Sequence, residues 1–129
     1  MNPDHKKVAQ LAARIFERNA RNFRDWEYEW GVNIYRTPDG RTVEGTPTMG
    51  DRSEVVMPDE SQLGVLVGSV HSHPDGEACL SDFDRELGQK LANESGHSHA
   101  MYVIGWDADG ENVVMVEEVF EPEEAGRDC

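Results

Sequence analysis

The sequence has few cysteines, few basic residues and no long apolar run, and each scarcity excludes a class of protein. Its 129 residues include only Cys79 and Cys129, too few for a disulfide framework, which favours a reducing compartment. Lysine and arginine number 12 against 26 acidic residues, so the clustered cations that nucleic-acid phosphates need are scarce. The longest apolar run, LGVLVGSV, is too short to span a membrane, and the first residues lack the apolar core of a signal peptide. We therefore expect a cytoplasmic protein that binds neither nucleic acid nor a membrane.

The sequence does contain the pattern of one α/β domain, which we expect to occupy residues 1–129 with its core at about 26–119. The expected elements are a helix at about 3–23, a second helix at 81–96 that ends at Gly96, and a tail at about 121–129. Apolar and β-branched segments predict strands, listed here with the hairpin first: 26–46, 53–58, 63–70, 100–106 and 111–120. The alternation predicts a central mixed sheet flanked by the N-terminal helix and by a helix after a histidine motif.

The histidine motif follows the strand at 63–70. His71 and His73 are two residues apart, Pro74 comes next, and Ser81 and Asp84 begin the second helix. Histidine is the commonest protein metal ligand near neutral pH. We expect the strand to end or twist at His71, because we expect both histidines to turn to one ion only in that case. Pro74 favours such an end, since it cannot continue a hydrogen-bonded ladder. Two histidines and one aspartate make three ligands, which with a water molecule is the pattern of catalytic zinc sites.

The spacing Ser81-x-x-Asp84 also has a purely structural interpretation, because it matches a helix capping box. In such a box the serine caps the helix and the acidic residue bonds back to the serine's backbone. Aspartate is shorter than the preferred glutamate or glutamine. Ser81 could therefore cap the helix while the Asp84 side chain points elsewhere. By itself, the spacing Ser-x-x-Asp favours the capping interpretation.

Taken together, His71-x-His73-Pro74, seven residues after His73, and Ser81-x-x-Asp84 resemble the JAMM motif (also MPN+ or JAB) of metalloproteases. The resemblance covers roughly residues 26–119. It implies a zinc ion held by His71, His73 and Asp84, and a Ser81 hydroxyl that polarises the scissile carbonyl. It also implies a peptidase or isopeptidase acting on a protein or peptide, for example the C-terminal tail of a ubiquitin-like protein or its conjugates.

Members of this family further use a glutamate from an earlier strand as the general base. The candidates here are Glu27, Glu29, Glu44, Glu54 and Glu60. Glu29 fits best, because EWGVNIY at 29–35 resembles a stretch of bacterial JAB-like domains associated with polymorphic toxins and effectors. Glu27, on the same strand face, stays open as the alternative.

Three other functions of a protein with this histidine motif compete with the peptidase interpretation. One is a non-catalytic JAB-like binding module, and another is an effector-type amide hydrolase whose substrate is unrelated to ubiquitin. The third is an iron oxygenase with two histidines and one carboxylate, although a helix directly after the histidine pair disfavours it. The sequence leaves the oligomeric state open.

A second His-x-His pair, His97 and His99, has neither a following proline nor a Ser-x-x-Asp. We expect it to form a polar loop with exposed imidazoles. Cys79 lies between the predicted ligands. We expect it to be a small loop side chain near the cleft and not a fourth ligand, which would close the site.

Overall fold

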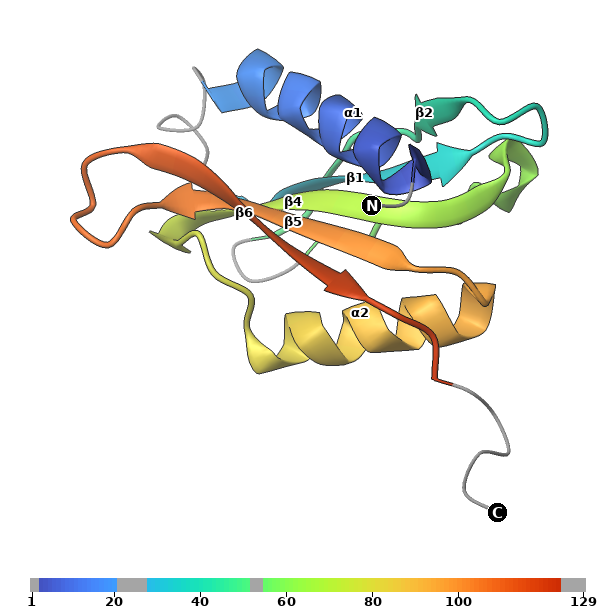
Figure 1. The fold of residues 1–129 in the computed structure, drawn as a ribbon. Coiled ribbons are helices and arrows are strands. Elements are labelled where there is room, and N and C mark those ends of the chain that lie inside the picture. Colours follow the sequence, from blue (N-terminus) through green and yellow to red (C-terminus); the bar gives the residue numbers. More distant parts are fainter. Residues whose placement is uncertain (1–2, 21–27, 52–54, 124–129) are drawn as a thin grey trace.

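A computed structural model describes residues 3–20, 28–51 and 55–123 (Figure 1). The elements, in chain order, are α1 (Pro3–Ala20), β1 (Trp30–Arg36), β2 (Thr42–Glu44), β3 (Thr48–Met49), a short 3-10 helix (Ser61–Leu63), β4 (Val65–Glu77), α2 (Asp82–Ser95), β5 (His99–Trp106) and β6 (Val113–Phe120).

The described strands form one mixed sheet in the order β2-β1-β4-β5-β6, with β3 paired to the start of β1. All neighbours are antiparallel except β4 and β5, which are parallel. A parallel pair needs a crossover connection, and α2 supplies it. Helix α1 covers one face of the sheet and α2 covers the other (Figure 1). The predicted mixed sheet between two helices is confirmed, whereas the domain limits at residues 1 and 129 stay a prediction.

The core has two parts, one on each face of the sheet. Under α1, apolar side chains of the helix meet those of the central strands; the larger members are Val8, Leu11, Ile15, Trp30, Val32, Ile34, Val67, Val70, Tyr102 and Ile104. Under α2, Leu80 packs with Met101 and Val103 of β5, and Leu87 and Phe120 pack against them. The cluster under α2 has fewer buried apolar members than the one under α1.

An irregularity in β4 decides which side chains reach the α2 face. Ile34 of β1 pairs with Gly68, but the next residue, Tyr35, pairs with Leu66, so Val67 is an extra residue. Such a bulge shifts the alternation of side chains along the bulged strand by one.

The shift places Val67 and Val70 in the same core cluster, under α1. Beyond the bulge, side chains alternate normally, so Ser69, His71 and His73 lie on the α2 face. The two histidines thus share a face through the ordinary period of a strand, with no need for the strand to end between them.

The predicted strand end at His71 is wrong, because β4 continues to Glu77. Its pairing with β5 shifts register between Ser72 and Glu77, which pairs with Trp106. Gly105 makes this course feasible, because a Cβ there would lie 2.6 Å from the Ala78 nitrogen. The pairing of β4 with β5 is therefore interrupted after Ser72 and resumes at Glu77.

The predicted strand at 53–58 is also wrong where it can be checked, since residues 55–58 form no strand. The position beside β1 is taken by β3, through Trp30–Met49 and Gly31–Thr48 pairs. The 55–57 segment lies over Gly31 instead, where a Cβ would meet the Met57 Sδ at 2.6 Å. The expected helix end at 21–23 and the strand start at 26–27 fall outside the described residues.

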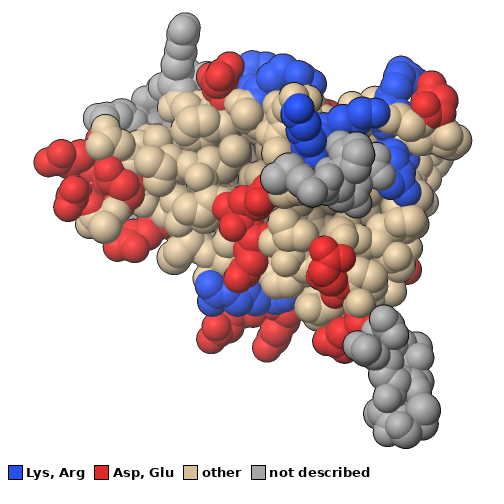
Figure 2. All heavy atoms as spheres, viewed as in Figure 1, with Lys and Arg blue, Asp and Glu red and all other residues tan. Residues whose placement is uncertain are grey.

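Three connections contain a glycine in the left-handed region, and the expected helix end at Gly96 is confirmed. Gly40 and Gly110 have φ of +87° and +71° in the β1–β2 and β5–β6 connections, and Gly96 caps α2 in the left-handed conformation. Figure 2 shows Lys and Arg side chains gathered mainly over α1 and the adjoining end of the sheet, and acidic side chains in several separate groups on a face that is mostly uncharged. No helix in the described part of the chain has the length and apolarity needed to cross a membrane.

Candidate metal centre

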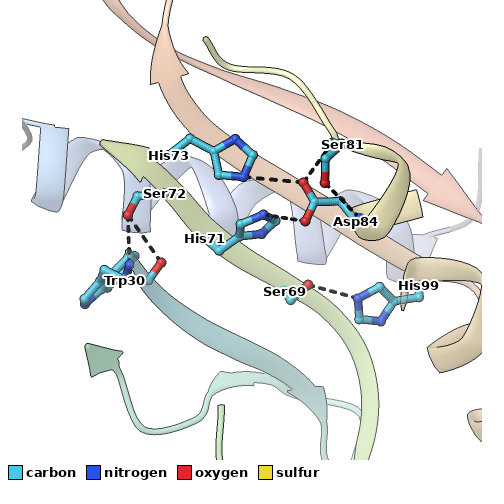
Figure 3. Close-up of polar contacts among 8 residues, drawn as sticks. All are labelled: Trp30, Ser69, His71, Ser72, His73, Ser81, Asp84 and His99. Atoms are coloured by element: carbon cyan, nitrogen blue, oxygen red, sulfur yellow. Dashed lines mark hydrogen bonds and ion pairs between the residues drawn. The ribbon is translucent and has the colours of Figure 1, made fainter. Parts of the chain in front are cut away.

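Three predicted ligands converge at the end of β4 (Figure 3). The Nε2 of His71 lies 3.2 Å from Oδ1 of Asp84, and the Nε2 of His73 lies 3.4 Å from Oδ2. One donor atom from each of the three residues lies within 4.8 Å of the others, and no other such group occurs in the described ranges. β4 supplies both histidines from one face, and the first turn of α2 supplies the carboxylate.

Asp84 is held in place by the capping box at the start of α2. Its backbone N–H donates to Ser81 Oγ at 3.1 Å, and its Oδ2 accepts from the Ser81 backbone N–H at 3.0 Å. The capping interpretation of Ser81-x-x-Asp84 is therefore confirmed, and Asp84 faces the histidines without leaving the box. A carboxylate has about four acceptor sites, so one side chain can cap the helix and face two imidazoles at the same time.

The electrostatics of the cluster favour an ionised carboxylate. Burial raises the pKa of Asp84, but contacts with His71, His73 and the Ser81 N–H outweigh it and hold that pKa well below its ordinary value. The contact with Asp84 raises the pKa of His73, burial opposes this, and the charge of Glu29 adds to the rise.

The cluster also fits a metal ion because one of its buried nitrogen atoms has no hydrogen-bond partner. The Nε2 of His71 is buried and makes no hydrogen bond, although Asp84 lies within ion-pair distance. A buried polar atom left without a hydrogen bond costs roughly 1–3 kcal/mol, and a metal ion removes that cost. Two imidazoles and a carboxylate are a usual donor set for catalytic zinc. Cys79 is exposed and does not belong to the group.

Glu29 lies directly before β1 and lines the same cavity as the three ligands. The side chain is buried, with 8% of its surface exposed. Its backbone is fixed on one side, where the Glu29 N–H donates to Asp51 O at 2.8 Å and the Glu29 carbonyl accepts from Gly50 at 2.7 Å. The structure therefore brings the favoured glutamate and the three ligands together.

The other candidate glutamates divide into two groups. Glu44 forms an ion pair with Arg18 at 2.6 Å, and Glu60 accepts from the Thr46 backbone N–H at 2.6 Å, so both serve contacts elsewhere. Glu27 and Glu54 fall outside the described residues.

The cavity has a volume of about 380 Å³. Its lining combines the polar cluster with apolar side chains and consists of Glu29, Val55, Met57, Ser69, His71, His73, Ser81, Phe83, Asp84, Leu87, Leu91 and Met101. Ser81 is exposed at its edge. Its Oγ accepts from the Asp84 N–H, which leaves the hydroxyl hydrogen available to a substrate.

Two serines in β4 have roles that the motif alone does not indicate (Figure 3). Ser72, between the two ligand histidines, points to the opposite face and accepts from the Trp30 backbone N–H at 2.9 Å. This bond ties β1 to β4 right after Glu29. The strand alternation of His-Ser-His was the signal that could have found it.

The other serine, Ser69, lies 3.0 Å from Nε2 of His99, through its Oγ. His99 is fully buried in β5, so the expectation of an exposed loop imidazole is wrong for it. Burial lowers the pKa of His99 to about 4, which keeps the ring neutral. The sequence feature that could have indicated this burial is the apolar run at 100–106. The strand that it forms begins one residue earlier, at His99, and so buries the ring.

His97 is exposed, as expected, and lines a larger cavity of about 560 Å³ together with His5, Arg36 and Glu121. That cavity lies on the α1 side, at the start of β5. It contains no convergent group of three ligands among the described residues, so its size does not make it the reactive site.

A family model described as prokaryotic homologs of the JAB domain matches residues 12–119. The match spans the second half of α1, all of α2, the described strands except the last residue of β6, and the three convergent ligands. It does not bear on the closer likeness to toxin-associated domains, which stays a prediction. A search of curated proteins found no match.

Proposed function

Since the chain belongs to the prokaryotic homologues of the JAB domain, we propose that it is a zinc-dependent hydrolase of amide or isopeptide bonds. The family includes zinc metallopeptidases, and it also includes members without the metal-binding residues. The observation that carries the proposal is the convergence of His71, His73 and Asp84 in a cavity that Glu29 also lines.

In this proposal the side chains of His71, His73 and Asp84 hold the zinc ion. Zinc, when bound, supplies Lewis acidity, which lowers the pKa of coordinated water and polarises a carbonyl group. The ionised state of Asp84 and its attachment to the helix cap support the role of a fixed anionic ligand. Ligands that are held in place before the ion arrives lose less conformational freedom on binding.

Glu29 acts as the general base. It takes a proton from the attacking water and delivers it to the nitrogen of the leaving amine, a role worth typically about 10²–10⁴-fold in rate. Ser81 donates its hydroxyl hydrogen to the substrate carbonyl oxygen, where negative charge develops. The exposure of Ser81 at the cavity edge supports this role, because the donor must reach a substrate.

The proposed substrate is a protein or peptide, with the tail of a ubiquitin-like protein or its conjugate as one candidate and an effector target as another. The net charge of −14 favours a partner with a basic surface. The proposed location is the cytoplasm, on the grounds of the low cysteine content.

The test combines metal analysis with hydrolysis assays on ubiquitin-like fusions, isopeptide conjugates and unfolded proteins. We expect close to one zinc per chain, and we expect Glu29→Gln to keep the zinc and lose at least about 100-fold in hydrolysis rate. Glu86→Gln is the matched control, because Glu86 is exposed on α2.

Other outcomes select the competing functions. Full activity in Glu29→Gln removes Glu29 from the role of general base. A chain that binds no metal is a binding module, and bound iron with oxygen-dependent turnover indicates an oxygenase.

A further inference from the structure

The apolar stripe of α2 packs against the sheet only in part. Phe83, Leu87 and Leu91 lie at the spacing of a helical packing face, but the buried residues of α2 are Asp84, Gly88 and Ala92. Gly88 lies so close to Phe120 that a Cβ would meet its ring at 2.5 Å, which draws this neighbouring stripe onto the sheet.

Phe83, Leu87 and Leu91 line the cavity beside the metal cluster. Leu87 is partly packed against the core, whereas Phe83 is 65% exposed. Phe83 lies between Asp82 and Asp84 in the first helical turn and lines the cavity. Its side chain is part of one wall of a groove that continues past Leu87 to Leu91.

The opposite wall of the groove is the segment at 55–57. Val55 and Met57 line the cavity, and both lie over Gly31 of β1, where a Cβ would meet the Met57 Sδ at 2.6 Å and the Val55 Cγ1 at 3.2 Å. Val56, between them, is 76% exposed and does not line the cavity. This alternation directs two apolar side chains of the segment toward the groove and one away from it.

The floor of the groove is β4 and β5, through Ser69 and Met101. Ser69 is the one polar floor residue away from the cluster among the described lining residues, and its Oγ is engaged by buried His99. The floor therefore offers an apolar surface, because its hydroxyl already has a partner within the protein.

The groove has a definite length and charge. Leu91 is seven residues beyond Asp84, which at 1.5 Å per residue places it about 10 Å along the helix from the metal cluster. That distance accommodates about three residues of extended chain. The described lining contains acidic side chains at the metal end and no lysine or arginine, so it offers no partner for a free carboxylate.

We propose that this groove, between α2 and the 55–57 segment, binds an uncharged apolar side chain of the substrate, such as leucine, methionine or phenylalanine, next to the bond that is cut. The inference rests on the proposed function and specifies its substrate class. A bond flanked by glycine on that side leaves the apolar walls in contact with water. An internal bond is preferred over one beside a C-terminal carboxylate.

Methionine methyl NMR tests binding without hydrolysis. The zinc-loaded Glu29→Gln protein is titrated with N-acetyl-leucine N-methylamide and, separately, with the glycine analogue. We expect saturable shifts of the Met57 and Met101 methyl signals, with at least about tenfold tighter binding of the leucine compound. Met49 and Met115 are internal controls, because Met49 lies exposed on β3 and Met115 packs under α1.

Phe83→Ser and Val56→Ser form a matched pair, since both side chains are exposed and only Phe83 lines the groove. We expect Phe83→Ser to weaken leucine binding at least about threefold and Val56→Ser to leave it unchanged. Equal binding of the two compounds, unmoved Met57 and Met101 signals, or an equal effect of the two variants would overturn the inference.

The outcome for the groove is separable from that for the hydrolase. Selective leucine binding without any hydrolysis would sustain the groove and refute the hydrolase. Equal hydrolysis rates for bonds next to leucine and next to glycine, together with no shift of the methyl signals in the titration, would support the proposed hydrolase and refute the proposed groove.

Discussion

Ser81 and Asp84 each accept a hydrogen bond from the backbone N–H of the other, at 3.1 and 3.0 Å. The same Asp84 carboxylate faces both histidines of the cluster. The start of α2 and the proposed ligand set are therefore one structure, and the helix orients its ligand whether or not an ion is present.

Replacement of Asp84 by asparagine should separate these two roles. The asparagine amide would retain one oxygen to accept the Ser81 N–H, but it would lack the negative charge and the second oxygen that faces the histidines. We expect zinc content, measured by elemental analysis, to fall from about one per chain to a small fraction. Asp82→Asn is the control, because the Asp82 side chain is fully exposed in the same helical turn. Undiminished zinc in the Asp84→Asn variant would exclude Asp84 from the ligand set.

Ser72→Ala should loosen β1 without removing a ligand. The Trp30 N–H loses its acceptor in a buried position, which costs roughly 1–3 kcal/mol of unfolding free energy. We expect this loss in urea unfolding, together with a lower kcat and unchanged zinc content, since Glu29 is adjacent to Trp30. Ser61→Ala, at an exposed position, should change stability by less than about 0.5 kcal/mol. A variant as stable as the wild type would show that the Ser72 bond contributes little.

Stability should fall with acid because His99 is buried in its neutral form. Its pKa is lowered from 6.5 to about 4, so the unfolded chain binds the proton more tightly than the folded one. The contribution of neutral His99 to the free energy of unfolding is complete above pH 6.5 and is lost as the pH falls from 6.5 toward 4. The loss amounts to at most about 3 kcal/mol. Unfolding free energies measured across this range should show a shallower slope in the double variant Ser69→Ala with His99→Leu. Identical slopes would mean that other groups carry the pH dependence.

Gly105→Ala should strain the connection that follows the histidines. The new methyl group would lie 2.6 Å from the Ala78 nitrogen and 2.7 Å from the Glu77 carbonyl carbon, both of them backbone atoms that cannot rotate away. We expect a loss of roughly 1–3 kcal/mol in thermal or urea unfolding. Gly76→Ala is the matched control from the same connection, because its Cβ would meet nothing nearer than the His73 Cβ at 3.7 Å. Similar stability of both variants would show that the crossing backbone can yield.

The part of the site that could be predicted from sequence is the part encoded in one continuous segment. His71 and His73 lie on one strand face by alternation, and Asp84 follows at the start of a helix marked by Ser81. The resemblance of the segment at 29–35 to bacterial JAB-like domains indicates Glu29 as the general base. The sheet between two helices could also be predicted, since apolar periodicity and turn residues mark each element locally.

What the sequence could not indicate depends on which surfaces meet. Phe83, Leu87 and Leu91 have the period of a packing face, whereas Gly88 indicates a close approach to the sheet by the neighbouring side of the helix. Contact with Phe120 makes the side with Gly88 the buried one, and Leu87 packs only in part. His99 has the composition of a loop residue, and only the extension of β5 buries it. In both cases local patterns were compatible with two arrangements, and tertiary contacts selected one.

All three proposed metal ligands lie in the single stretch from β4 to the first turn of α2, whereas Glu29 lies directly before β1. In the proposed function, metal binding and proton transfer therefore depend on different parts of the sheet. A variant that loosens the start of β1 is expected to lower the hydrolysis rate while it keeps the metal, so mutation can separate the two properties.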